Sequence, residues 1–152
     1  MNARQLPIPL LLAGAIVFAC GPRTRSTEAA ATPHHRASSR TPLTAAVDVR
    51  PGATTTFVLS VTNDGPKRIE VDFPSGQTYD FTVLDSAGAT VWTWSEGRMF
   101  TQALRNKPLA QGESLTYEER WNATGRHGRH AVVARLASSN YPIEKRVEFV
   151  LP

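Results

Sequence analysis

The side chains that could take part in catalysis or metal binding are few and widely separated. Cys20 is the only cysteine among 152 residues, so no disulfide can form within the chain. His127 and His130 have the H-x-x-H spacing that two zinc ligands can show, but a stable zinc site needs three or four ligands. No cysteine accompanies the pair, and no carboxylate lies nearer than Glu119. We therefore expect a solvated loop here, with no metal and no other cofactor.

Motifs of catalysis are absent from the sequence. It contains no G-x-S-x-G nucleophile elbow, no phosphate-binding glycine loop and no H-E-x-x-H, each of which would place a reactive group in a defined local geometry. The sequence therefore predicts a protein that binds and does not catalyse.

The charge distribution argues against nucleic acid as a partner. The formal net charge is +4, but the excess lies before residue 43. From Leu43 onward there are 12 Lys or Arg and 12 Asp or Glu. A nucleic-acid binder needs a basic surface that displaces counterions from phosphate, and a neutral domain has no such surplus.

An apolar run from Leu6 to Ala19 predicts a secretion signal. As a helix, its 14 residues would be about 21 Å long, too short for a hydrocarbon core of about 30 Å. Arg4 provides a short positive region before it. We interpret residues 1–20 as a signal peptide.

The end of this run, Val17-Phe18-Ala19-Cys20-Gly21, resembles a bacterial lipobox. The resemblance implies that Cys20 becomes lipidated and that Gly21 permits sorting to an outer membrane where the host has one. Phe18 departs from the pattern, which usually has a smaller residue, and a plain secretory signal with an incidental cysteine is the alternative. Residues 21–42 have no aliphatic side chain larger than Ala and predict a disordered tether. We expect an exported, lipid-anchored protein with its domain outside the cytoplasm.

From residue 43 to 152 apolar and polar residues alternate repeatedly. Such alternation places one face of each strand on a core and the other in water. The inward sets are Phe57, Leu59 and Val61; Ile69, Val71 and Phe73; Tyr79, Phe81 and Val83; Leu115, Tyr117, Glu119 and Trp121; Val132, Ala134 and Leu136; and Val147, Phe149 and Leu151. Turn residues separate these runs. They predict an all-β, immunoglobulin-like antiparallel sandwich of seven to eight strands.

Two features of the predicted domain need separate treatment. Trp92 and Trp94 share a strand face and Trp121 belongs to another inward set, so we expect all three to pack in the core. Residues 95–104 break the alternation, because Met99 and Ala103, and Phe100 and Leu104, lie four apart. This spacing fits either a helical turn or an irregular crossover.

One group of motifs has a family likeness. It comprises Ser75-Gly76-Gln77, Tyr79-Asp80-Phe81, Val83 and Asp85, followed by Val91-Trp92-Thr93-Trp94-Ser95, Gly97-Arg98-Met99-Phe100 and Gln102-Ala103-Leu104. Together these blocks resemble the bacterial intracellular proteinase inhibitor (BsuPI-type) family over residues 43–152. The resemblance implies an immunoglobulin-like sandwich and inhibition of a serine protease. Gln111 departs from a common Pro, and His130 departs from a common aromatic residue.

The family likeness suggests a protein-binding module displayed on the cell envelope as a proteinase inhibitor. The alternative is a structural or assembly lipoprotein that docks on another envelope protein without inhibition. The candidate partner-binding residues are Ser75, Gly76, Gln77, Glu96, Arg98 and Met99.

Each candidate also has a structural interpretation. Gly76 fits a tight connection in which glycine adopts a positive φ. Residues 95–104 fit a crossover that plugs the sandwich edge with Phe100 and Leu104. In the functional interpretation, Arg98 or Met99 enters the specificity pocket of a protease.

Overall fold

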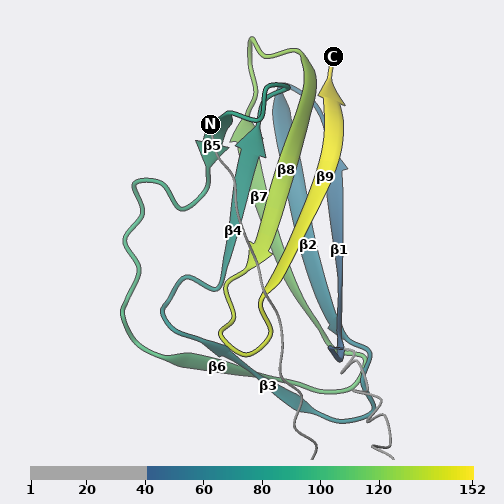
Figure 1. Ribbon diagram of the computed structural model, residues 1–152, viewed down its shortest axis with the longest axis vertical. Helices are drawn as coiled ribbons and strands as arrows, with labels where there is room; N and C mark the ends of the chain where they lie inside the picture. The colour runs from purple at the N-terminus through teal and green to yellow at the C-terminus, as the bar shows by residue number, and fades with distance from the viewer. Residues whose placement is uncertain (1–40) are drawn as a thin grey trace, which may run out of the picture. The chain divides into compact units, whose positions relative to one another are not determined.

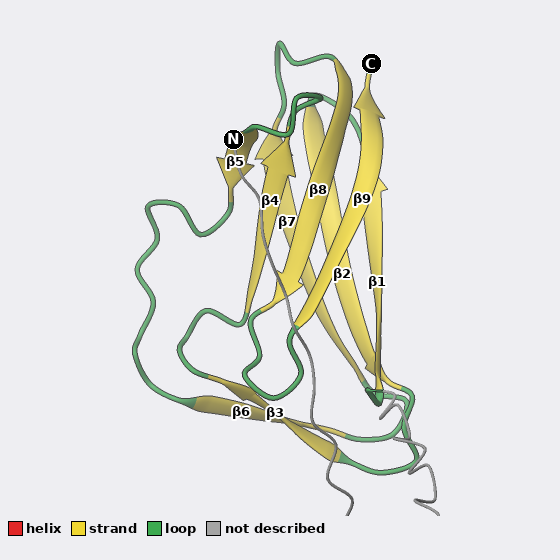
Figure 2. Ribbon diagram, in the orientation of Figure 1, coloured by secondary structure: helices red, strands yellow, loops and turns green. Residues whose placement is uncertain are grey.

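The computed structural model describes residues 41–152. The predicted signal peptide, the lipidation residue Cys20 and the tether up to Arg40 lie outside the described residues. All the regular structure within residues 41–152 is β-strand, as the alternation predicts (Figure 2). No helix in that range is long and apolar enough to cross a membrane.

Nine strands form the domain, one or two more than expected. They are β1 (Leu43–Arg50), β2 (Thr54–Asn63), β3 (Ile69–Phe73), β4 (Tyr79–Leu84), β5 (Thr90–Thr93), β6 (Arg105–Leu109), β7 (Ser114–Asn122), β8 (Gly128–Leu136) and β9 (Ile143–Leu151). The strands absent from the expected set are β1 and β6. Four of the five β6 residues are exposed, Pro108 among them, and only Leu109 is buried. The strand therefore lacks an alternation of buried and exposed residues.

Two antiparallel sheets make the sandwich, with strand orders β1-β2-β7 and β5-β4-β8-β9 (Figure 1). The alternating side chains of both sheets meet between them. Phe57 is fully buried at the centre of this core, with ring centroids 5.9 Å from Phe81, 6.1 Å from Trp92 and 6.4 Å from Trp121. Trp94 and Trp121 are buried and Trp92 packs against the core, which confirms the expectation for all three tryptophans.

A third sheet, the β3–β6 ribbon, lies across one end of the sandwich (Figure 1). Val71 and Phe73 on β3, and Leu109 on β6, turn inward and are fully buried or nearly so. The loop after β8 covers the other edge of β3, where Asn140 donates to the Glu70 carbonyl over 2.8 Å and accepts from the Asp72 amide over 2.9 Å. The ribbon therefore closes the core, and the loop after β8 supplies hydrogen-bond partners for the edge of β3 that does not pair with β6.

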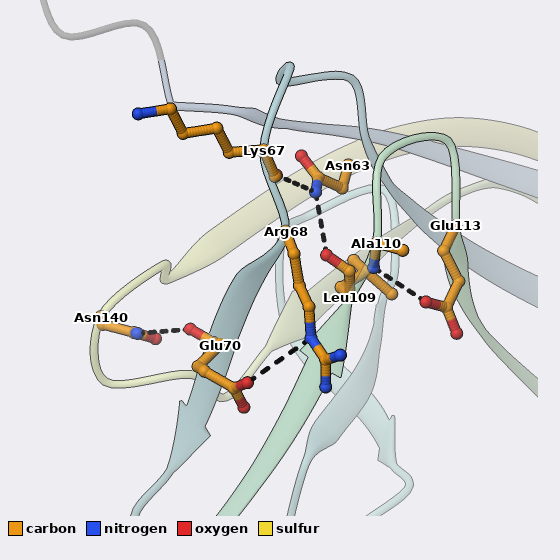
Figure 3. A network of polar contacts seen from close by, with 8 residues as sticks. All are labelled: Asn63, Lys67, Arg68, Glu70, Leu109, Ala110, Glu113 and Asn140. Atoms are coloured by element: carbon orange, nitrogen blue, oxygen red, sulfur yellow. Dashed lines mark hydrogen bonds and ion pairs between the residues drawn. The ribbon is translucent and has the colours of Figure 1, made fainter.

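Asn63 joins this ribbon to the sandwich (Figure 3). Its side chain is fully buried, and its amide nitrogen donates to the Lys67 carbonyl over 2.8 Å and the Leu109 carbonyl over 2.9 Å. Its amide oxygen accepts from the Gly65 N–H over 3.0 Å. One polar side chain thus fixes the β2–β3 connection against the end of β6, and all of its bonds are to backbone.

The two histidines have different environments. His130 is buried on β8, in register with Phe149, with its ring centroid 5.9 Å from Trp121 and 5.9 Å from Phe149. The solvated-loop expectation is wrong for His130, because the strand begins at Gly128 and turns this ring inward, where it takes the place of an aromatic core residue. His127 is exposed, and its Nδ1 lies 2.5 Å from the Pro152 carbonyl oxygen.

Candidate protein-binding site

The segment between β5 and β6 is a turn over residues 94–97 followed by irregular chain over residues 98–104. It contains no helix, so of the two alternatives the crossover is the one observed. Residues 96–104, here called the exposed segment, run from the sandwich to the ribbon along one side of the domain (Figure 1). All of them except Phe100 are exposed.

The base of the exposed segment rests on three stacked aromatic rings. Trp94 lies 4.3 Å from Tyr79, and Tyr79 lies 4.3 Å from Tyr117, measured between ring centroids. The Tyr79 hydroxyl donates to the Glu119 carboxylate over 2.5 Å. Burial raises the pKa of Tyr79 above its ordinary value, and the hydrogen bond to Glu119 raises it further. Burial also raises the pKa of Tyr117, so both hydroxyls keep their protons to a higher pH than a solvent-exposed tyrosine does.

Two side chains of the exposed segment fold back onto Trp94. The Arg98 guanidinium lies 4.5 Å from the Trp94 ring centroid, and its Nε donates to the Trp94 carbonyl over 2.8 Å. The Phe100 ring centroid lies 5.6 Å from that of Trp94. Met99, between them, is 98% exposed. The segment is therefore anchored on each side of one free apolar side chain.

Asp80 ties the turn to β4. Its carboxylate accepts from the Phe81 N–H over 2.9 Å, from the Ser95 N–H over 3.1 Å and from the Ser95 hydroxyl over 2.5 Å. It also accepts from the Gln77 side-chain amide over 3.1 Å. A single carboxylate with four donors fixes the start of the exposed segment and the connection before β4.

The connection over residues 75–77 lies against the far part of the exposed segment. The Gly76 N–H donates to the Thr101 carbonyl over 2.8 Å. A Cβ on Gly76 would lie 2.7 Å from the Thr101 hydroxyl oxygen and 3.3 Å from its amide nitrogen. Gly76 is not among the glycines with positive φ, so the expected reason for glycine is wrong. Close approach of another chain segment, and not a left-handed conformation, requires it.

The structure thus brings the two groups of candidate residues together. Gly76 and Gln77 support the segment that carries Glu96, Arg98 and Met99, through the Gly76–Thr101 hydrogen bond and through Asp80. The Ser75 hydroxyl accepts from the Gln77 N–H over 3.2 Å and so holds the connection itself. The side chains of Gln77 and Arg98 each donate a hydrogen bond within the domain, Gln77 to the Asp80 carboxylate and Arg98 to the Trp94 carbonyl.

The edge-plug interpretation is wrong for one of its two residues. Phe100 is half-buried against Trp94, but Leu104 is 84% exposed. A helical turn would put residues four apart on the same side. Because the chain here is irregular, Phe100 and Leu104 face different surroundings.

Sequence reasoning missed Asp80 and Thr101 as positioning residues. The alternation in β4 assigns Asp80 to the solvent face, and the turn that buries it comes 15 residues later. Thr101 contributes a carbonyl, which carries no residue-type signal. Among the residues that the structure describes, no group of three or more His, Cys, Asp or Glu side chains is arranged to hold a metal ion.

A family model described as intracellular proteinase inhibitor, BsuPI, matches residues 43–141. The chain belongs to this family. The BsuPI match covers eight of the nine strands in full, all but β9, together with both groups of candidate residues and the whole exposed segment. The family's description is that of an inhibitor of proteinases.

Solved structures resemble this BsuPI domain only distantly, and a search of curated proteins finds no match. A β-glucosidase from intestinal bacteria has 14% identity and a TM-score of 0.41, covering 74% of this chain and 16% of its own. A β-glucosidase from Kluyveromyces marxianus has 12% identity and a TM-score of 0.42, covering 74% and 14%. A structural-genomics target from Bordetella pertussis has 17% identity and a TM-score of 0.41, covering 72% and 91%. The chain thus spans about a sixth of the first of these.

Proposed function

We propose that this BsuPI domain inhibits a serine protease by presenting the exposed segment to the active-site cleft. The observation that carries the proposal is that every residue of the segment except Phe100 is exposed, and yet the segment is held at Asp80, Trp94 and Gly76. Ordering a flexible loop on binding costs free energy, so a loop that is ordered beforehand binds more tightly. Protease–inhibitor complexes form with little backbone movement for this reason.

The anchors also explain how a substrate-like segment would resist turnover. A protease releases a substrate when the two halves separate after cleavage. Here the chain before the exposed segment is bound through Ser95 to Asp80, and the chain after Met99 is bound through Thr101 to Gly76. Both new ends would stay in the cleft, where the peptide bond re-forms in preference to product release.

We place this inhibition outside the cytoplasm, with the domain tethered to the cell envelope through an acylated Cys20. Support comes from the sequence: an apolar run too short to span a bilayer, a small residue before Cys20, and a polar stretch before Leu43. The target would then be a secreted or envelope protease and not the intracellular one of the family's description.

The inhibition test is a titration of secreted and envelope serine proteases with the full chain in detergent. We expect a stoichiometric loss of peptidase activity for at least one of them. No loss of activity at micromolar excess of the full chain would remove the inhibitor assignment.

The lipid anchor at Cys20 has its own test, which is independent of inhibition. Cells that express the full chain are labelled with a radioactive fatty acid, and a Cys20→Ala variant serves as the matched control. We expect the label on the wild-type protein alone. Equal labelling of the two proteins, or none on either, would contradict the lipid anchor.

A further inference from the structure

We propose that Met99 is the residue that determines specificity, and that the target is a serine protease with an uncharged, apolar specificity pocket. This inference rests on the proposed function and assigns the partner class of that same site. Residues on the rim of such a complex exclude water, and one central side chain in a pocket carries much of the affinity.

Met99 has the geometry of that central side chain. It is 98% exposed, and among the described residues no hydrogen bond involves its backbone or side chain. Its neighbours Arg98 and Phe100 both pack on Trp94, on which the segment is seated. Met99 therefore projects away from the domain while the chain on either side is fixed, with its N–H and C=O free to pair with an enzyme's cleft in the manner of an added strand.

Arg98 is a poor candidate for the same role, although it is a charged neighbour. Its guanidinium is already placed over the Trp94 ring and its Nε is bonded to the Trp94 carbonyl. Entering an acidic pocket would require breaking both contacts, and so would remove one of the two side chains that seat the segment on Trp94. The geometry therefore disfavours trypsin-like proteases, whose pocket holds a carboxylate for basic side chains.

Leu104, the other strongly exposed apolar residue of the segment, lies at its end. It is 84% exposed, but Arg105 directly after it is already paired with Phe73 in the β3–β6 ribbon. A cleft that binds several residues on each side of the cleaved bond would meet a sheet strand there. Met99 has five residues of irregular chain after it before β6 begins.

The chemistry of Met99 sets the pocket. An unbranched thioether side chain adapts to irregular apolar cavities. Burying a Met side chain in such a pocket is worth roughly tenfold to a hundredfold in affinity. A carboxylate in the same pocket would be buried without a partner.

The experiment compares full-chain variants against two serine proteases, one with an apolar pocket and one with an acidic pocket. We expect the wild type to inhibit the first more strongly. Met99→Asp should weaken that inhibition on the order of a hundredfold or more, and Met99→Lys should shift inhibition toward the acidic pocket. Val150→Asp is the matched control, because Val150 is an exposed apolar residue on β9, 59% exposed, and its replacement should change neither inhibition constant.

The outcomes separate the inference from the function on which it rests. If the wild type inhibits but Met99→Asp inhibits equally well, or if the acidic pocket is the preferred one, the role of Met99 is wrong and inhibition stands. If the wild type inhibits neither protease, both fail. Melting temperatures of the Met99 variants should match the wild type, because Met99 makes no buried contact that its replacement could remove.

Discussion

Replacing Asp80 by alanine should release the exposed segment from the sandwich while the domain stays folded. The substitution removes the acceptor of four hydrogen bonds, from Gln77, Phe81 and twice from Ser95. A buried donor left without a partner costs about 1–3 kcal/mol. The Phe81 N–H is buried, whereas the donors on Gln77 and Ser95 are part-buried and can regain water. We therefore expect the free energy of unfolding to fall by about 3–5 kcal/mol. This loss is smaller than the total of ~5–15 kcal/mol that stabilises a typical domain.

The assay is urea unfolding followed by tryptophan fluorescence, with Asp85→Ala as the matched control. Asp85 also accepts two backbone hydrogen bonds, from Ala87 and Ala89 over 2.9 Å each, but in the exposed β4–β5 turn. We expect the control to lose about 1 kcal/mol and to inhibit normally. In the absence of urea, where Asp80→Ala is folded, it should inhibit at least about tenfold more weakly than the wild type, because binding must now order the segment. Equal loss of stability in the two variants, or unchanged inhibition by Asp80→Ala, would refute the reasoning.

Three further predictions concern the ribbon, the aromatic column and the close approach at Gly76. Asn63→Ala should lower the free energy of unfolding by about 2–4 kcal/mol, because it leaves buried backbone groups unpaired; a urea midpoint like that of the wild type would contradict this. The raised pKa values of Tyr79 and Tyr117 mean that the folded state holds protons that the unfolded state releases above about pH 10. Their contribution to stability is thus complete below that pH and is lost as the pH rises through the folded-state pKa. Between pH 8 and pH 11, the melting temperature of the wild type should therefore fall more steeply than that of Tyr79→Phe. Gly76→Ala should lower the melting temperature and weaken inhibition, and adding Thr101→Ala should restore part of both by removing the nearest clashing atom; no recovery in the double variant would mean that contact with the Thr101 hydroxyl is not the cause.

The sandwich was predictable because its strands alternate. Phe57, Leu59 and Val61 turn to the core on β2 and their neighbours do not, and period-two patterns of this kind report burial on one face. The ribbon strand β6 was not predictable, because an exposed strand with Pro108 and a single buried end has no such pattern. Its existence follows from pairing with β3, which is a long-range contact.

The candidate site was predictable in its residues but not in its geometry. Motif likeness pointed to Gly76 and Met99, yet nothing local shows that they belong to adjoining stretches of backbone. The contact depends on the Gly76–Thr101 hydrogen bond and on Asp80, which links residues 15 apart. Leu104 illustrates the same limit, since its spacing from Phe100 fits burial only if the intervening chain is helical.

Amide hydrogen exchange of the full chain, with and without a serine protease that it inhibits, tests the central claim most directly. Residues 96–104 and 75–77 should exchange more slowly in the complex. The exchange rates of β1 and β9, the edge strands at the ends of the two sheets away from β7 and β5, should be unchanged. Protection of β1 and β9, with no change over residues 96–104, would contradict the assignment of the exposed segment as the protease-binding site.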